Sequence, residues 1–370
     1  MMKTRGLSTT WWIIIGVIIV VVVVGAAVAY YYHPTAKKKP LVIYELISYT
    51  GNSYFQIMIN GSKYAAAVIE KEYGVPVELI VEDADNTLST QVTQFQAATA
   101  AHPDCILVNP VSPSSEVSYA QSAESAGIFV LSLDRGIPGT PYVGSNNTQL
   151  GIMDAEALIQ FLEEYNYPKP WRIVFIEGPP STGVGYERNT AIMSVLEPFI
   201  KNGTIQIIAA QNGEFLSTTA YTIMQDVLAT THNITAVITA NGLEAEGAAQ
   251  ALMAAGIPIG PPYGVIITAI DFTPDVAYYI SKGWIQATAG QSPWVMGYWG
   301  VMLCYFHVYE HYTPPQTIIT TSAVVTASNL TQGYYTLQGP VNLANYVPGA
   351  PSTPVIPSLV SQYGGYYSSG

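Results

Sequence analysis

Carboxylates, side-chain amides, a guanidinium and aromatic rings follow the short apolar runs of this sequence. The polar and aromatic residues after these runs are Ser48, Asn52, Tyr54, Phe55, Asp134, Arg135, Phe215, Asn241, Asp271 and Gln291. The set contains no nucleophile–base pair. Carboxylates accept hydrogen bonds, amides donate and accept them, and a guanidinium donates in a fixed fork. With aromatic faces beside them, these groups suit a sugar, whose hydroxyls both donate and accept.

The apolar runs are long enough for buried strands and alternate with segments of helical spacing. Expected strands lie at 41–47, 76–81, 105–109, 128–133, 172–176, 204–210, 235–239 and 264–270. Expected helices lie at 55–72, 89–101, 114–126, 150–165, 187–201, 217–230 and 243–255. Continuous apolar strands separated by helices indicate parallel sheets covered on both faces. Two such series predict an α/β fold of two doubly wound parallel-sheet lobes.

Ligands bind beyond the carboxyl ends of the strands in such sheets, so we expect the polar residues named above to share one cleft. A further helix at 294–312 and a strand-like segment at 317–326 are too short to form a third domain. We expect both to return and complete the first two lobes.

Several of these residues stand in short motifs with a fixed order along the chain. The motifs are Asn52-Ser53-Tyr54-Phe55, Asn109-Pro110, Leu133-Asp134-Arg135, Glu187-Arg188, Asn241, Asp271 with Thr273-Pro274-Asp275, and Gln291. From about Leu41 to Thr326 the sequence resembles the ribose-binding group of type I periplasmic binding proteins, the solute receptors of ABC importers. The resemblance implies that a three-segment hinge joins the two lobes.

The resemblance also implies a role for each site residue. The residues that would bind sugar hydroxyls are Asn52, Asp134, Arg135, Asn241, Asp271 and Gln291, and those that would enclose the ring are Tyr54, Phe55 and Phe215. Ser48 would donate to the ligand or support a residue that does. Tyr186 stands where the family has a ligand-binding arginine, so a phenol replaces a charge there. The alternatives are that Asn241 only caps the helix at 243–255 and that the rings are core residues.

The function implied by the resemblance is capture of a monosaccharide, with a pentose as first candidate, and delivery to an ABC permease by closure of the cleft. It implies no cofactor, no metal and no enzymatic step. The alternative is a membrane-tethered receptor ectodomain that senses a ligand in the same cleft. His307-Val308-Tyr309-Glu310-His311 matches the H-x-x-E-H pattern of some zinc proteases. A third ligand cannot be identified, so a chance match on a helix is favoured.

The expected organisation has four parts. A signal, membrane anchor and stalk occupy 1–39; the N-terminal lobe comprises 40–147 plus 292–318, and the C-terminal lobe 148–291 plus 319–335. The tail, 336–370, is rich in Pro, Gly, Tyr and Ser. Pro348, Pro351, Pro354 and Pro357 repeat with the three-residue period of polyproline II, so we expect a semi-ordered or disordered appendage.

Composition excludes two broad classes. Hydrophobic residues make up 49% of the 370 residues, which is ample for packed cores and excludes general disorder. Five of the 13 basic side chains and none of the 25 acidic ones lie in the first 39 positions. The remainder is strongly acidic, which excludes nucleic acid as a partner. Cys105 and Cys304 could form one disulfide, but their apolar neighbours favour two buried free thiols.

The N-terminus predicts export and membrane attachment. Trp11–Ala29 is 19 residues without a charge, about the length of a membrane-spanning helix, and Lys3 and Arg5 precede it. This charge bias places the rest of the chain on the extracellular face. Arg5-Gly6-Leu7-Ser8 resembles the archaeal class III, prepilin-like signal, which is cut after the glycine and leaves the apolar segment in place. The alternative is an ordinary signal peptide cut near Ala26–Ala29.

Five N-x-S/T sequons agree with an exported chain, since glycosylation of this kind takes place on exported segments. They are at Asn60, Asn146, Asn202, Asn233 and Asn329, and we expect these to be glycosylated. Few charges with many Tyr, Ser and Thr would also suit an acidic medium, where carboxylates are protonated near pH 4.

Overall fold

The computed structural model describes residues 19–24 and 38–366. Contacts divide the chain into Met1–Lys39 and Pro40–Gly370, which are described separately. In the first unit, residues 19–24 are helical and their side chains are exposed. Within these described residues, no helix is both long and apolar enough to cross a membrane. The predicted Gly6 cleavage site, and the predicted span Trp11–Ala29 except for 19–24, lie outside the described residues.

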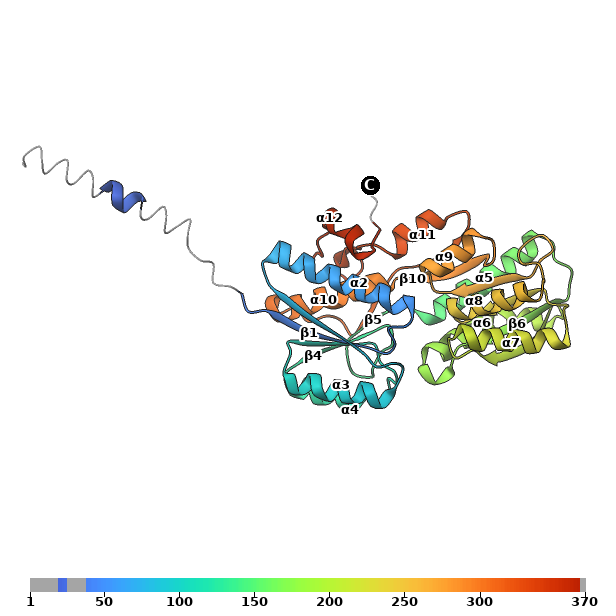
Figure 1. Cartoon of the computed structure of the whole chain (residues 1–370), viewed down its shortest axis with the longest axis horizontal. Helices are drawn as coiled ribbons and strands as arrows, with labels where there is room; N and C mark the ends of the chain where they lie inside the picture. The colour runs from blue at the N-terminus through green and yellow to red at the C-terminus, as the bar shows by residue number, and fades with distance from the viewer. Residues whose placement is uncertain (1–18, 25–37, 367–370) are drawn as a thin grey trace, which may run out of the picture. The chain divides into compact units, whose positions relative to one another are not determined.

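The unit Pro40–Gly370 contains two six-stranded sheets with the same strand order (Figure 1). The first sheet has the order β11-β5-β4-β3-β1-β2 and the second β12-β10-β9-β8-β6-β7. The first consists of β1 (Leu41–Ile47), β2 (Val77–Asp83), β3 (Cys105–Val108), β4 (Phe129–Leu133), β5 (Tyr142–Gly144) and β11 (Thr317–Ile319). The second consists of β6 (Trp171–Glu177), β7 (Ile205–Asn212), β8 (Ala236–Thr239), β9 (Ile266–Ile270), β10 (Ala287–Gln291) and β12 (Ser322–Thr326).

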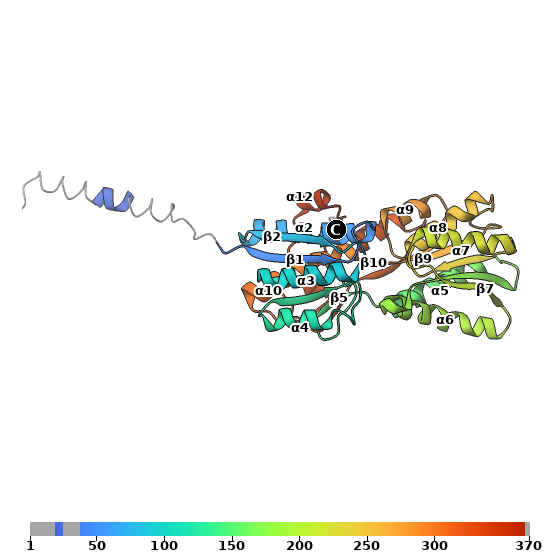
Figure 2. The same cartoon turned by 60° about the horizontal axis from the view of Figure 1, so that its bottom comes forward.

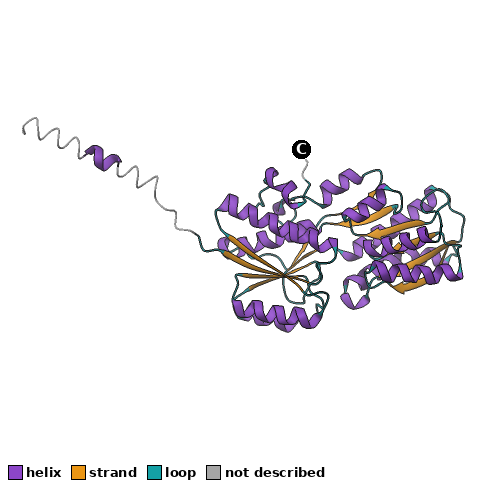
Figure 3. Cartoon of the chain, in the orientation of Figure 1, coloured by secondary structure: helices purple, strands orange, loops and turns teal. Residues whose placement is uncertain are grey.

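Both sheets are covered by helices on both faces, as Figures 2 and 3 show. In the first lobe, α2 (Ser53–Val68) and α10 (Pro293–Glu310) cover one face, and α3 (Leu88–Ala101) and α4 (Val117–Ser125) the other. A π-helical turn, Ile69–Tyr73, extends α2. In the second lobe, α5 (Asn147–Glu164) and α6 (Val184–Lys201) cover one face. The opposite face carries α7 (Ser217–Thr230), α8 (Gly242–Ala254), α9 (Pro274–Ser281) and α11 (Leu330–Leu337).

The neighbouring strands pair in parallel, apart from β10 and β12, which pair antiparallel. Central strands such as β3 and β9 are buried along their whole length, which is why their sequences are apolar or small without alternation. The predicted α/β fold of two doubly wound lobes is therefore confirmed. The chain passes between the sheets three times, from β5 to α5, from β10 to α10 and from β11 to β12.

The tail departs from the sequence-based expectation. A disordered or semi-ordered appendage was predicted for 336–370, and this is wrong for residues 336–366. Leu343, Val347, Ile356 and Val360 are buried in the hydrophobic core with α2 and α10, and the tail contains a short helix, α12 (Pro357–Val360). The helix α10 is apolar on all sides, and such a helix must be covered on all sides. The proline spacing did not reveal that covering role.

Cys105 and Cys304 are free thiols, and both are buried. Their positions on β3 and α10 place them inside the core of the first lobe. The interpretation as two buried thiols is confirmed.

A carboxyl group is buried in the same core. Glu45, in the middle of β1, points toward the α2 side of the sheet and is fully buried. Ser62 of α2 donates a hydrogen bond to one of its oxygens at 2.7 Å, and the other oxygen has no partner. Burial raises the pKa of Glu45 from its ordinary 4.5 to about 7. The folded protein therefore holds this proton at pH values where the unfolded chain has released it.

This proton makes folding stability depend on pH. The stabilisation that comes from holding the Glu45 proton is complete below pH about 4.5 and is lost as the pH rises to about 7. The free energy of unfolding changes by about 3 kcal/mol over this range. We expect Glu45→Gln to match the wild type in urea unfolding at pH 4.5 and to be more stable by about this amount at pH 8. Glu78→Gln, at an exposed position of β2, is the control. Equal stability of Glu45→Gln and wild type at both pH values would contradict the assignment.

Candidate functional site

A small cavity of about 40 Å³ lies where the carboxyl ends of the two sheets meet. It is lined by Asn52, Tyr54, Phe55, Asp134, Arg135, Val184, Arg188, Phe215, Asn241, Asp271 and Gln291. The structure thus brings together the predicted site residues apart from Ser48 and Tyr186. Asp134, Phe215 and Asp271 have φ angles of 63°, 56° and 85°, in a region that residues other than glycine seldom adopt. Such backbone strain concentrates at functional sites.

On the side of the first lobe, the Asp134 carboxylate is the centre of a hydrogen-bond network. The Tyr54 hydroxyl donates to Oδ1 at 2.8 Å, and Asn109 Nδ2 donates to Oδ2 at 3.2 Å. Arg135 Nε lies 3.8 Å from Oδ2. Burial raises the pKa of Asp134, while the Arg135 charge and the Tyr54 hydroxyl oppose that rise. A positioned carboxylate of this kind accepts hydrogen bonds from hydroxyls.

Ser48 lies behind this network and does not line the cavity. It is fully buried, and its hydroxyl donates to Asn109 Oδ1. Asn109 in turn donates to Asp134, so Ser48 orients a residue that holds the carboxylate. Asn109 was not predicted as a site residue. Its position directly after β3, at the same sheet edge as Ser48 and Asp134, is the signal that would have revealed it.

On the side of the second lobe, Arg188 and Asp271 form a buried ion pair at 3.6 Å. Asn147 Oδ1 accepts from Arg188 Nε at 3.0 Å, and the Ala240 carbonyl accepts from another guanidinium nitrogen at 2.9 Å. Gln291 Nε2 donates to Asp271 Oδ1 at 2.6 Å. The arginine is therefore held from three sides, with its charge against the second carboxylate of the site.

Two aromatic rings lie next to the arginines. The Arg135 guanidinium is 5.9 Å from the Phe55 ring centroid, and that of Arg188 is also 5.9 Å from the Phe215 ring centroid. Tyr54 meets Phe55 edge to face. Each lobe thus contributes a ring, a carboxylate and a guanidinium to the same cavity.

Asn241 caps α8 and also lines the cavity. Its side chain accepts from the Glu244 backbone, and the Glu244 carboxyl accepts from the Asn241 backbone. Glu244 also accepts from the Phe215 backbone at 3.0 Å, which holds the loop that carries the ring. The cap and the site residue are therefore the same side chain, and the two interpretations of Asn241 do not exclude each other.

Two polar atoms of this site are buried without a hydrogen-bond partner. They are Gln291 Oε1 and Arg135 Nε. Buried polar atoms are almost always paired in native proteins, because an unpaired group costs about 1–3 kcal/mol. One is an acceptor and the other a donor, which are the partners that a hydroxyl-rich ligand needs.

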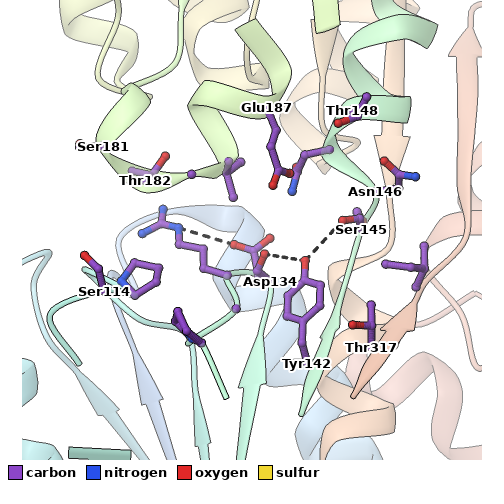
Figure 4. A pocket seen from close by; sticks show the side chains of 18 residues that line it. Ser114, Asp134, Tyr142, Ser145, Asn146, Thr148, Ser181, Thr182, Glu187 and Thr317 are labelled. Carbon is purple, nitrogen blue, oxygen red and sulfur yellow. Dashed lines mark hydrogen bonds and ion pairs between the residues drawn. The ribbon is translucent and has the colours of Figure 1, made fainter. Parts of the chain in front are cut away.

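A second, larger space adjoins the first and shares Asp134, Arg135 and Val184 with it (Figure 4). Its volume is about 570 Å³, within the usual range for a small-molecule site. Ser114 and Tyr142 come from the first lobe, Thr182 and Glu187 from the second, and Asn146 from a hinge crossing. The Tyr142 hydroxyl donates to the Asp134 carbonyl oxygen at 3.0 Å. The two spaces form one cleft between the lobes.

Tyr186 lines neither space. Its side chain is 61% exposed. The helix α6 begins at Val184, and its residues Val184 and Arg188 both line the cavity. Residues four apart share a helix face and a residue midway between them points away, so Tyr186 cannot share their direction. The arginine of this site is Arg188, which was noted in the Glu187-Arg188 motif but was not predicted to bind; helical spacing from Val184 is the signal for it.

The H-x-x-E-H segment lies at the end of α10. His307 stacks on Phe129 at 4.2 Å, and His311 ends the helix with a φ of 54°. Among residues 19–24 and 38–366, no group of three His, Cys, Asp or Glu side chains is arranged to hold a metal ion. The zinc-protease pattern thus finds no third ligand in the part of the chain that the structure describes.

Residues 43–309 match the family model of the periplasmic binding protein domain, and the chain belongs to that family. It is 25% identical over 263 residues to the ribose import binding protein of Bacillus subtilis, covering 70% of this chain and 79% of that protein. Its fold matches a solute-binding protein of Actinobacillus succinogenes solved with D-allose, at a TM-score of 0.69 and 22% identity, over 79% of this chain and 99% of that one. It also matches, at 0.69 and 21%, a protein of Agrobacterium radiobacter in complex with D-arabinose, over 79% and 96%.

The hydrogen bond from Arg188 to Asn147 tests whether the arginine is held as described. Asn147→Ala removes the acceptor of a buried charged donor, so we expect unfolding free energy to fall by about 1–3 kcal/mol in urea titrations. Gln149→Ala, at an exposed position in the same turn of α5, should change it by less than about 0.5 kcal/mol. If the two variants lowered the free energy of unfolding equally, the hydrogen bond between Arg188 and Asn147 would not hold the arginine in place.

Proposed function

We propose that this protein is a sugar receptor that binds a monosaccharide between its lobes and delivers it to an ABC importer. The observation that carries the proposal is the buried cavity in which both lobes contribute a carboxylate, a guanidinium and a ring, with Gln291 Oε1 and Arg135 Nε left without a hydrogen bond. A sugar hydroxyl can satisfy either atom.

The chemistry of the site also gives selectivity. Asp134 and Asp271 accept hydrogen bonds, Arg135 and Arg188 donate them, and the rings of Phe55 and Phe215 suit the apolar faces of a sugar. A site of fixed polar groups rejects an epimer that leaves one of them unpaired. The relative of Bacillus subtilis is named for ribose import, which supports a pentose as the first candidate for this chain.

Binding requires movement of the lobes. The part of the cleft between the rings of Phe55 and Phe215 has a volume of only about 40 Å³, which is less than a sugar ring needs, although it adjoins the space of about 570 Å³. The ligand therefore enters an arrangement in which the lobes are further apart, and closure then surrounds it. The ligand shifts the population toward the closed arrangement, which the permease would recognise.

The proposal predicts sugar binding by the compact unit 40–370. Calorimetric titration with a panel of pentoses and hexoses should give micromolar or tighter affinity for at least one pentose. Asp134→Ala and Asp271→Ala should each weaken it by about 100-fold or more, because charged acceptors are lost from a buried site. Asp226→Ala, at an exposed position of α7, is the control. Failure of every sugar to bind would overturn the proposal.

We also propose that the protein is tethered to the extracellular face of the membrane by Trp11–Ala29, with the signal cut after Gly6. The sequence carries this part of the proposal through its uncharged run and the preceding Lys3 and Arg5. Glycosylation of the exposed sequons Asn146, Asn202, Asn233 and Asn329 would agree with it, whereas Asn60 is half-buried on α2.

The tether is tested by cell fractionation. The full chain should remain with membranes after alkaline carbonate washing, because a spanning helix is held by the hydrocarbon core. A variant in which an ordinary cleavable signal replaces residues 1–39 should appear in the medium or the soluble fraction. Release of the full chain by the wash would contradict the tether. Mass spectrometry of its N-terminal peptide would show whether Leu7 is the first residue.

A further inference from the structure

The tail after α11 makes a connection between the lobes in addition to the three hinge crossings. Its starting point is fixed to the second lobe. Leu337 is fully buried in the core formed with Val325 and Phe272. Gln338 Nε2 donates to the Phe272 carbonyl oxygen at 2.6 Å, and the Tyr334 and Phe272 rings are 5.0 Å apart. This anchor is buried and hydrogen-bonded to Phe272 and Tyr334, so it moves with the second lobe.

The tail then docks on α10 of the first lobe. Trp299 Nε1 donates to the Val341 carbonyl at 2.7 Å, and the Tyr298 hydroxyl donates to that of Pro354 at 2.6 Å. Trp294 Nε1 donates to the Tyr363 carbonyl at 3.0 Å. Figure 1 shows α12, within this segment, lying over α2 and α10. This second anchor moves with the first lobe.

The far end of the tail returns to the second lobe. The Tyr366 backbone N–H donates to the Gln338 carbonyl at 2.5 Å, and the Tyr366 and Tyr334 ring centroids are 4.6 Å apart. In between, Thr321 of the third hinge crossing donates to the Tyr346 hydroxyl at 3.1 Å. The tail therefore contacts both lobes and the hinge itself.

The link between the anchors is short. Gln338 belongs to the anchor on the second lobe and Val341 to the anchor on the first, three residues later. An extended chain spans at most about 3.6 Å per residue, so these two points cannot separate by more than about 11 Å. A wider hinge motion at this point would have to strip one of the buried anchors.

We propose that residues 338–366 form a strap that limits how far the lobes separate. By restricting the open arrangements, the strap raises the fraction of molecules close to the closed arrangement. The apparent affinity of a ligand rises in proportion to the competent fraction. The tail is then a determinant of opening range and of ligand release, in addition to being a cover for α10.

The strap is tested by lengthening its link without removing its anchors. Six residues of Gly and Ser are inserted between Gly339 and Pro340; in the control, the same six follow Gly349, at an exposed turn beyond the link. Spin labels at Ser122→Cys on α4 and Asp226→Cys on α7 report the distance between the lobes, because both positions are exposed and the native thiols are buried. The measurement uses the protein without ligand, so its outcome does not depend on the sugar proposal.

We expect the link insertion to broaden the distance distribution toward longer separations and the control insertion to leave it unchanged. Tyr366→Ala, which removes the return contact with Tyr334 but keeps the link length, should give a smaller shift in the same direction. If a sugar ligand is known, the link insertion should weaken its apparent affinity by about threefold or more. Because Tyr363 and Tyr366 form a second short connection between the lobes, the link insertion is also combined with Tyr366→Ala. A distance distribution identical to wild type in this combined variant would overturn the proposal.

Discussion

Two buried carboxylates at the ends of strands impose the main constraint on this molecule. A carboxylate removed from water must be surrounded by donors or lose its charge. Asp134 follows β4 and Asp271 is next to the end of β9, and both sit in left-handed backbone conformations. Tyr54 and Asn109 donate to the first, and Gln291 and Arg188 interact with the second. These partners come from four elements around the cleft: Tyr54 from α2, Asn109 from the end of β3, Gln291 from β10 and Arg188 from α6.

Each lobe surrounds its buried carboxylate with similar groups. Each has a strand order that places a carboxylate at the same sheet edge, an arginine beside it and a ring against the arginine. The arginines differ in how they are held. Arg188 is fixed by Asn147 and a backbone carbonyl, whereas Arg135 donates to the Pro110 carbonyl and its Nε, 3.8 Å from Asp134 Oδ2, makes no hydrogen bond. The donor without a hydrogen bond, Arg135 Nε, lies on the first lobe, and the acceptor without one, Gln291 Oε1, lies on the second. A ligand that forms hydrogen bonds with both atoms would connect the two lobes.

The sequence predicted the elements that strong physical patterns specify. Buried parallel strands have continuous apolar runs, and their ends locate polar residues at one edge, so the fold and most of the cavity lining could be predicted. Tyr186 was misplaced because the motif was aligned by analogy and the direction of side chains on α6 was not considered. The roles of Arg188 and Asn109 were missed because they depend on hydrogen bonds to Asn147 and Asp134, which lie far from them in the sequence. The tail was misjudged because its partners, Trp294, Tyr298 and Trp299, lie far away in the sequence.

We infer that a sugar supplies the hydrogen bonds that Gln291 Oε1 and Arg135 Nε lack. A crystal structure of residues 40–370 with the best-bound pentose tests this most directly. We expect the sugar ring to lie between Phe55 and Phe215, with ligand oxygens within hydrogen-bond distance of Gln291 Oε1 and Arg135 Nε. A sugar bound outside this cavity, or a closed structure in which protein groups alone satisfy both atoms, would contradict it.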